Sequence, residues 1–121
     1  PLNTSGPFHT ELLAPASNEL KEKFVSVNFN EMQAPVIFNS SAKELESGVS
    51  IAQMLEKQVM SSVYFEDSIR YMLENGVDTI IEIGPGKVLS GFIRKIDKTI
   101  KTYQVEDQAS LEKTLVGLKG E

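Results

Sequence analysis

The chain has 121 residues, of which 40% are apolar and 24% charged, and its formal net charge at pH 7 is −5. This composition is that of one folded domain and excludes an intrinsically disordered chain. The acidic charge argues against binding to nucleic acid and against docking on anionic lipid, because both need a basic surface.

The sequence has no cysteine and one histidine, so we expect no disulfide, no thiol chemistry and no metal site. No cofactor is expected either. No apolar run reaches the roughly 20 residues of a membrane span, and no signal peptide is visible, so we expect no membrane association and a cytoplasmic location. The chain starts Pro1-Leu2-Asn3, which we interpret as a piece of a longer polypeptide; the alternative is removal of a methionine before Pro1.

The first half of the chain is expected to contain two helices and one strand. Turn-forming residues dominate 1–10, and a helical stripe of apolar residues follows over 12–24, with Pro15 in the first turn. After a loop, residues 36–38 predict a short buried strand. A second helix is expected over 50–59, with Gln58 on the same face as its apolar residues.

A third helix is expected over 63–75. Ser62 is its candidate N-cap, and Gly76 is placed to end it in a left-handed conformation. Residues 79–83 are β-branched and almost continuously apolar, which predicts a parallel strand covered on both faces.

The last third of the chain is expected to contain two helices around an edge strand. Gly84-Pro85-Gly86 predicts a tight turn, and the helix after it is expected to bury Val88, Leu89, Phe92, Ile93 and Ile96. Residues 100–105 alternate weakly between apolar and polar, which predicts an edge strand. The final helix is expected to bury Leu111, Leu115 and Leu118.

Helices and strands therefore alternate along the chain, which indicates parallel strands joined by helical crossovers. The predicted fold class is α/β, a short parallel sheet flanked by helices. A buried strand such as 79–83 needs neighbours on both sides, so we expect upstream sequence that this chain lacks. The unpaired strand edge also predicts self-association of the chain.

His9 is the first candidate for chemistry. It is the one residue of the chain whose ordinary pKa suits proton transfer near neutrality. It lies in a Gly-Pro loop before a helix, and catalytic groups collect on such loops. The alternative is a surface histidine without a function.

Three blocks of the sequence together resemble bacterial malonyl-CoA:acyl-carrier-protein transacylases. They are Ser5-Gly6-Pro7-Phe8-His9-Thr10; Gln58 with Val63-Tyr64-Phe65-Glu66-Asp67-Ser68-Ile69 and Gly76-Val77-Asp78; and Glu82-Ile83-Gly84-Pro85-Gly86-Lys87-Val88-Leu89-Ser90-Gly91. The resemblance covers essentially all of the chain. It implies an α/β-hydrolase-like acyltransferase fold, of which residues 1–121 are the C-terminal segment of the large subdomain. The nucleophile-elbow half and the ferredoxin-like small subdomain are absent.

The resemblance implies an acyltransferase of fatty acid biosynthesis. A serine in a Gly-x-Ser-x-Gly elbow takes malonyl from malonyl-CoA and passes it to the phosphopantetheine thiol of acyl carrier protein. His9 matches the histidine that serves as general base and then protonates the leaving thiol. In the family a backbone carbonyl orients this histidine, and we expect the carbonyl of Tyr64. The chain contains no Gly-x-Ser-x-Gly motif, so the nucleophile serine is missing and the chain alone is expected to be inactive.

Phe8 and Gln58 are the candidate pocket residues. The resemblance implies that an aromatic residue before the histidine narrows the pocket at the malonyl C2 and favours malonyl over methylmalonyl; the alternative is that Phe8 only packs. Gln58 matches a glutamine placed to brace the site near the histidine. The alternative there is a core amide with its hydrogen bonds satisfied.

Two departures from the family and two other features complete the sequence reading. Thr10 stands where serine is usual, and Ser62 where proline usually precedes the valine. The stretch 84–87 lacks the spacing of a phosphate-binding loop, so we interpret its glycines as structural. One basic cluster suggests an alternative function, a non-catalytic module that docks acyl carrier protein; a solvated helix face is the simpler interpretation. This cluster comprises Lys87, Arg94, Lys95, Lys98 and Lys101.

Overall fold

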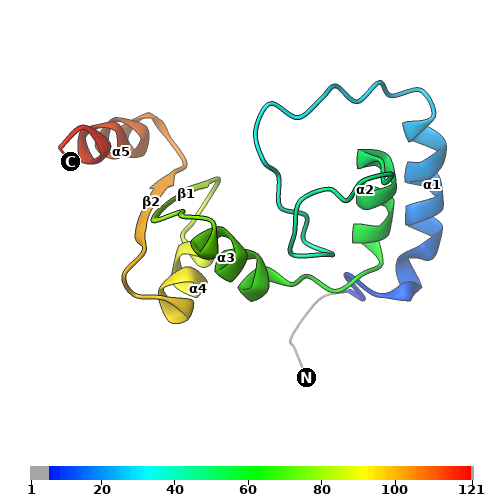
Figure 1. Cartoon of the computed structure of the whole chain (residues 1–121), viewed down its shortest axis with the longest axis horizontal. Helices are drawn as coiled ribbons and strands as arrows, with labels where there is room; N and C mark the ends of the chain where they lie inside the picture. Colours follow the sequence, from blue (N-terminus) through cyan, green and yellow to red (C-terminus); the bar gives the residue numbers. More distant parts are fainter. Residues whose placement is uncertain (1–5, 121) are drawn as a thin grey trace. The chain divides into compact units, whose positions relative to one another are not determined.

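The computed structural model describes residues 6–120, so Pro1-Leu2-Asn3 and Ser5, the first residue of the motif around His9, lie outside the described residues. The chain divides into two compact units, Pro1–Ser68 and Ile69–Glu121, and the boundary between them falls within helix α3 (Phe65–Glu74). The elements are η1 (Glu11–Leu13), α1 (Ala14–Phe24), α2 (Ile51–Val59), α3 (Phe65–Glu74), β1 (Thr79–Ile83), α4 (Val88–Ile96), β2 (Lys101–Val105) and α5 (Gln108–Lys119) (Figure 1).

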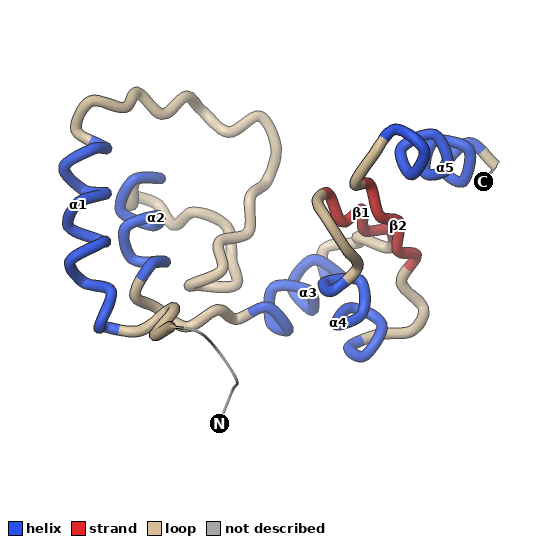
Figure 2. Tube along the Cα trace, turned by 180° about the vertical axis from the view of Figure 1, so that it is seen from behind, coloured by secondary structure: helices blue, strands red, loops and turns tan. Residues whose placement is uncertain are grey.

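Helices α1 and α2 pack side by side in the first unit (Figures 1 and 2). Pro15 lies in the first turn of α1, as predicted, and Ser50 caps α2 in a capping box with Gln53. The predicted apolar stripe is only partly covered: Leu20 and Phe24 are half-buried on the same face as the buried Ser17, whereas Leu12, in η1, is exposed. The hydroxyl of Ser17 donates to the carbonyl of Glu56, 2.8 Å away, so a hydrogen bond joins the two helices where the sequence suggested only apolar packing.

The predicted strand over 36–38 is wrong. Phe38 forms only an isolated antiparallel bridge with Lys43, and Val36 is 42% exposed. The amide of Ala42 donates to the carbonyl of Phe38, 2.8 Å away, which closes a tight turn. Residues 36–38 have the apolar composition of a strand, but among residues 6–120 no neighbouring strand forms backbone hydrogen bonds with them. Phe38 alone is buried, as the anchor of the turn.

Helix α3 starts later than expected and ends where expected. It begins at Phe65, so the prediction of Ser62 as its N-cap is wrong. At its other end Gly76 has φ 86°, its amide donates to Leu73, and the amide of Val77 donates to Met72. These two bonds form a Schellman motif, which needs a residue without a Cβ strain penalty at the left-handed position.

Strands β1 and β2 form a parallel pair in the second unit, with Ile81 opposite Tyr103. Helix α4 connects them, and both α4 and α5 pack against β2. Ile69 and Ile93 are the most deeply buried large side chains, at 1% and 2% exposure. The strand predictions over 79–83 and 100–105 are therefore confirmed.

Several residues expected to be buried are exposed among the described residues. Ile83 of β1 is 83% exposed, so this strand is not covered on both faces. The predicted inner faces of α4 and α5 are also partly exposed, at Val88, Leu89, Phe92, Leu111 and Leu115. The sequence therefore supplies more apolar surface than residues 6–120 cover.

Side-chain hydrogen bonds hold the turn between β1 and α4. Gly84 and Gly86 have φ values of 140° and 85°, which only glycine adopts freely. Glu106 accepts a hydrogen bond from the amide of Gly86 at 2.8 Å, and the amide group of Gln104 donates to the carbonyl of Gly84 at 2.9 Å. These contacts support the structural interpretation of the glycines.

Glu82 caps helix α4 from the end of β1. Its carboxylate accepts from the Ser90 hydroxyl at 2.6 Å, the Ser90 amide at 2.8 Å and the Leu89 amide at 3.0 Å. The Ser90 hydroxyl, then the Ser90 and Leu89 amides, hold the pKa of Glu82 below its ordinary value of 4.5, against a smaller opposing effect of burial. A carboxylate thus supplies the cap that Lys87, at the N-cap position, does not.

This lowered pKa predicts how Glu82→Gln changes acid stability. Because the folded-state pKa lies below the unfolded one, ionised Glu82 stabilises the fold above pH 4.5, and this stabilisation is lost as the pH falls through the folded-state pKa. We expect the variant to have a lower free energy of unfolding than the wild type above pH 4.5, with the gap closing in acid. Urea unfolding followed by circular dichroism over this range measures the gap.

The matched control is Glu74→Gln, an exposed carboxylate at the end of α3. It should keep the pH profile of the wild type. A gap between Glu82→Gln and the wild type that stays constant down to strongly acid pH would contradict the role assigned to this carboxylate.

No helix of the part of the chain that the structure describes is long and apolar enough to cross a membrane. Within the same residues, no group of His, Asp and Glu side chains could hold a metal ion.

Candidate active site

His9 lies in the loop before η1, on the surface of the first unit, with a backbone φ of 59°. This left-handed conformation is uncommon for a residue with a side chain and costs on the order of 1 kcal/mol. Such strain persists where surrounding contacts impose it, and it is enriched at functional sites. The conformation of His9 therefore calls for a contact that holds it.

That contact is a hydrogen bond to helix α2. Nδ1 of His9 lies 3.1 Å from the backbone carbonyl oxygen of Gln58, which is in the last turn of α2. The same carbonyl accepts from the amide of Ser61, 3.4 Å away, and carbonyls of a last helical turn carry the negative end of the helix dipole. With Nδ1–H donating to this carbonyl, Nε2 keeps its lone pair and can accept a proton.

Two further hydrogen bonds fix the loop that carries His9. The hydroxyl of Thr10 donates to the carbonyl of Pro7 at 2.8 Å, which closes the loop on both sides of the histidine. Two residues earlier in α2, the carbonyl of Glu56 accepts a hydrogen bond from the hydroxyl of Ser17. The end of α2 is thus held by α1 and by the loop before it. Serine in place of Thr10 carries the same hydroxyl, so this departure from the family is conservative.

The orienting carbonyl is not the one that the sequence suggested. Tyr64 was expected to supply it, but its carbonyl accepts from the amide and the hydroxyl of Ser68, at 3.0 and 2.8 Å. The carbonyl next to His9 belongs to Gln58. The error has a physical origin: every residue has a carbonyl, so only the predicted end of a helix near residue 59 could have pointed to it.

The structure places the other two predicted site residues as follows. Gln58 lies against His9 through its backbone, whereas the sequence had suggested its side chain. Phe8 is 61% exposed, with its ring edge about 3.3 Å from the position that a Cβ on Gly6 would take. Phe8 is therefore not part of a core made by the described residues, which disfavours a role in packing alone within them.

This arrangement supports proton transfer but not a complete nucleophilic site. Nε2 of an oriented histidine takes a proton from a hydroxyl or thiol placed beside it. Among residues 6–120, no serine hydroxyl is hydrogen-bonded to His9, and the whole sequence has no Gly-x-Ser-x-Gly.

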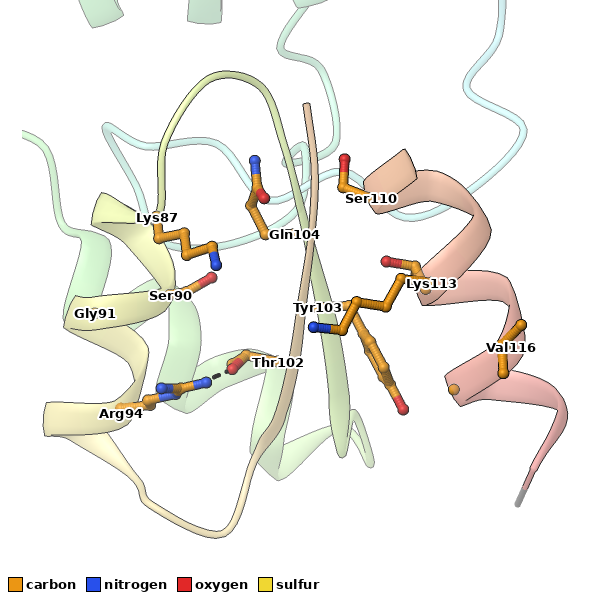
Figure 3. A pocket seen from close by; sticks show the side chains of 12 residues that line it. Lys87, Ser90, Gly91, Arg94, Thr102, Tyr103, Gln104, Ser110, Lys113 and Val116 are labelled. Atoms are coloured by element: carbon orange, nitrogen blue, oxygen red, sulfur yellow. Dashed lines mark hydrogen bonds between the residues drawn. The ribbon is translucent and has the colours of Figure 1, made fainter. Parts of the chain in front are cut away.

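The basic cluster predicted in the second unit divides into separate parts. Lys87 and Arg94 line a cavity of about 550 Å³, together with Lys113, which the sequence had not connected with them (Figure 3). Lys95 lies instead over the ring of Phe92, with Nζ 5.9 Å from the ring centroid. Lys98 and Lys101 are not part of the cavity lining.

The chain has relatives that cover its whole length. The malonyl CoA-acyl carrier protein transacylase of Bacillus subtilis (strain 168) is 43% identical over 121 residues, which are 100% of this chain and 38% of that protein. The crystal structure of malonyl CoA-acyl carrier protein transacylase from Clostridium perfringens has a TM-score of 0.91 and 41% identity, and covers 98% of this chain and 38% of its own. No family model matches the chain.

A third relative was solved with a partner. It is a malonyl-transacylase in complex with a type II PKS acyl-carrier protein, with a TM-score of 0.86 and 33% identity, covering 97% of this chain and 38% of its own. The chain thus spans 38% of the length of these three relatives. The predicted α/β fold class is confirmed, both by the parallel pair of β1 and β2 and by the solved structures that the chain matches.

Proposed function

Because this chain is related over its whole length to malonyl CoA-acyl carrier protein transacylases, we propose that it supplies the general base of such an enzyme. The complete enzyme transfers malonyl from coenzyme A to the phosphopantetheine thiol of acyl carrier protein through a malonyl-serine intermediate. The observation that carries this proposal is the 3.1 Å contact between His9 Nδ1 and the Gln58 carbonyl, which leaves Nε2 free to take a proton.

In the first half-reaction, Nε2 of His9 takes the proton of the serine hydroxyl while the serine oxygen attacks the thioester carbonyl of malonyl-CoA. The tetrahedral intermediate collapses, the C–S bond breaks, and Nε2–H returns the proton to the thiolate of coenzyme A. The imidazolium formed in between is stabilised by the Gln58 carbonyl at the negative end of α2. This carbonyl does the orienting work that an Asp does in a Ser-His-Asp triad.

The second half-reaction runs through the same nitrogen. The phosphopantetheine thiol of acyl carrier protein gives its proton to Nε2, and the sulfur attacks the malonyl-serine ester. The C–O bond breaks, and the serine oxygen takes the proton back from His9. The chain of 121 residues contains no Gly-x-Ser-x-Gly motif to supply that serine.

We assign residues 1–121 to the C-terminal segment of the large subdomain. The serine elbow and the small ferredoxin-like subdomain then come from the rest of the enzyme. We also assign Phe8 to the border of the malonyl C2, where its ring would exclude methylmalonyl; the support for this is that the ring is exposed and next to His9 in the chain. We assign the reaction to the cytoplasm.

This proposal predicts that the 121-residue chain alone has no malonyl transfer activity. Its reason is chemical: a general base without a serine nucleophile forms no acyl-enzyme. A radiolabelled transfer assay with malonyl-CoA and acyl carrier protein measures it, and the positive control is the chain together with the upstream part of a relative that contains Gly-x-Ser-x-Gly. Transfer by the chain alone at the rate of that control would overturn the proposal.

The chain alone is also expected to self-associate, because apolar side chains such as Ile83 and Val88 are exposed. Sedimentation of the chain alone, compared with the chain mixed with the upstream part of a relative, shows whether the chain self-associates by itself. A single species of 13.4 kDa for the chain alone would count against self-association.

A further inference from the structure

A cavity of about 550 Å³ in the second unit is separate from the elements that carry His9. It follows β2 along the edge that has no strand partner among the described residues, and α4 and α5 form its two walls (Figure 3). A volume of this size is in the range of small-molecule sites.

The charged residues that line this cavity all carry positive charge. They are Lys87, Arg94 and Lys113, and the lining contains no Asp or Glu, although the chain as a whole has a net charge of −5. Three cations that face one cavity repel one another unless an anion lies between them. The arrangement therefore favours an anionic ligand.

The polar groups around these cations are largely held in place. Nε of Arg94 donates to the hydroxyl of Thr102 at 3.2 Å, which orients the guanidinium and leaves its terminal N–H groups available (Figure 3). Two serines of the lining each donate to a carboxylate: Ser90 to Glu82 and Ser110 to Asp107. Neither carboxylate lines the cavity, so neither neutralises its cations directly.

The remaining wall is aromatic and aliphatic. The ring of Tyr103 lies against α5 at Gly117, where an added Cβ would come within 2.6 Å of a ring carbon. Glycine at this position therefore lets the ring approach the helix. Val116 continues the apolar wall. A ligand that fills the cavity needs an organic part as well as a negative charge.

We infer that this cavity binds a phosphate ester, with its phosphate between Lys87, Arg94 and Lys113 and its organic group against Tyr103. Arg and Lys bind phosphate through charge-assisted hydrogen bonds, and Arg does so with two parallel N–H donors. The inference rests on residues of the second unit and does not depend on the proposed function of His9.

The test is a calorimetric titration of the whole polypeptide that carries this chain, with phenyl phosphate, inorganic phosphate and phenol as probes. Phenyl phosphate should bind more tightly than inorganic phosphate, and phenol should not bind, because the phosphate supplies most of the attraction. Added salt should weaken binding. Each of Lys113→Gln and Arg94→Gln should weaken it by about tenfold or more, the size of one lost charge-assisted hydrogen bond.

Matched controls lie on the same two helices. Lys119→Gln on α5 and Lys95→Gln on α4 remove the same charge outside the cavity lining and should leave binding within about twofold of the wild type. Thermal unfolding of all four variants excludes misfolding as the cause of a loss.

Two outcomes would overturn the inference. One is an equal loss in control and lining variants, which would mean non-specific attraction to a basic surface. The other is binding of an acidic peptide in the absence of phenyl phosphate binding, which would mean a docking surface for a protein. If the lining variants lose phenyl phosphate binding and keep normal malonyl transfer, the phosphate site is supported and the proposed function of His9 is unaffected.

Discussion

Replacing His9 with asparagine in the complete enzyme is expected to lower kcat/KM for malonyl transfer by about 10⁴-fold or more, the size of losing a general base that works as a unit with its nucleophile. Asparagine is chosen because its side-chain N–H₂ takes the place of Nδ1–H and can still donate to the Gln58 carbonyl. Asparagine also tolerates the φ of 59° at this position. The variant therefore removes Nε2 and leaves the loop in place.

The control for this variant is Thr10→Ser. It keeps the hydroxyl that donates to the Pro7 carbonyl, so its kcat/KM should stay close to that of the wild type. Steady-state transfer to acyl carrier protein measures both half-reactions together, and trapping of the malonyl-serine ester measures the first half-reaction alone. Formation of the ester at the wild-type rate in His9→Asn would disprove the role of His9 as general base.

Ile93→Ala is expected to lower the free energy of unfolding by about 2–5 kcal/mol, the largest stability effect that we predict. Ile93 is 2% exposed and lies on α4 in the core of the second unit. The truncation removes buried apolar surface and leaves a cavity that rigid neighbours fill only in part. Urea unfolding monitored by circular dichroism measures the change.

Two companion variants calibrate this result. Ile93→Val removes one methylene group and should cost about 0.5–1.5 kcal/mol. Val88→Ala lies on the same helix at a side chain that is 63% exposed and should cost less than Ile93→Ala. A loss in Val88→Ala equal to that in Ile93→Ala would mean that residues outside 6–120 bury this face of α4.

The parts of the fold that depend on residues adjacent in the sequence were predictable from the sequence. Gly76 ends α3 because the Schellman motif needs a left-handed residue there, and Gly84 and Gly86 turn β1 into α4 for a related reason. The composition of residues 79–83 predicted β1 correctly. The same reasoning failed at residues 36–38, because apolar composition does not reveal whether a partner strand exists.

Burial was harder to predict than helix or strand. The apolar stripes of α4 and α5 are real, but Leu89 and Leu111 are exposed among the described residues, while Ser17 and Thr114 are buried. A stripe indicates which face is suited to burial, and whether that face is covered depends on elements elsewhere in the chain or outside it. The chain spans 38% of the length of the relatives that it matches.

The sequence by itself pointed to His9 as the candidate base, because it is the one histidine of the chain, in a Gly-Pro loop, with two further blocks that resemble the same family. Tertiary structure alone decided what holds it. The carbonyl that contacts Nδ1 belongs to Gln58, 49 residues further along the chain. Lys113 is likewise distant in sequence from Lys87 and Arg94, and the fold brings all three to one cavity. Backbone carbonyls are common to every residue, and convergence in space leaves no local pattern, so neither contact has a signature in the sequence.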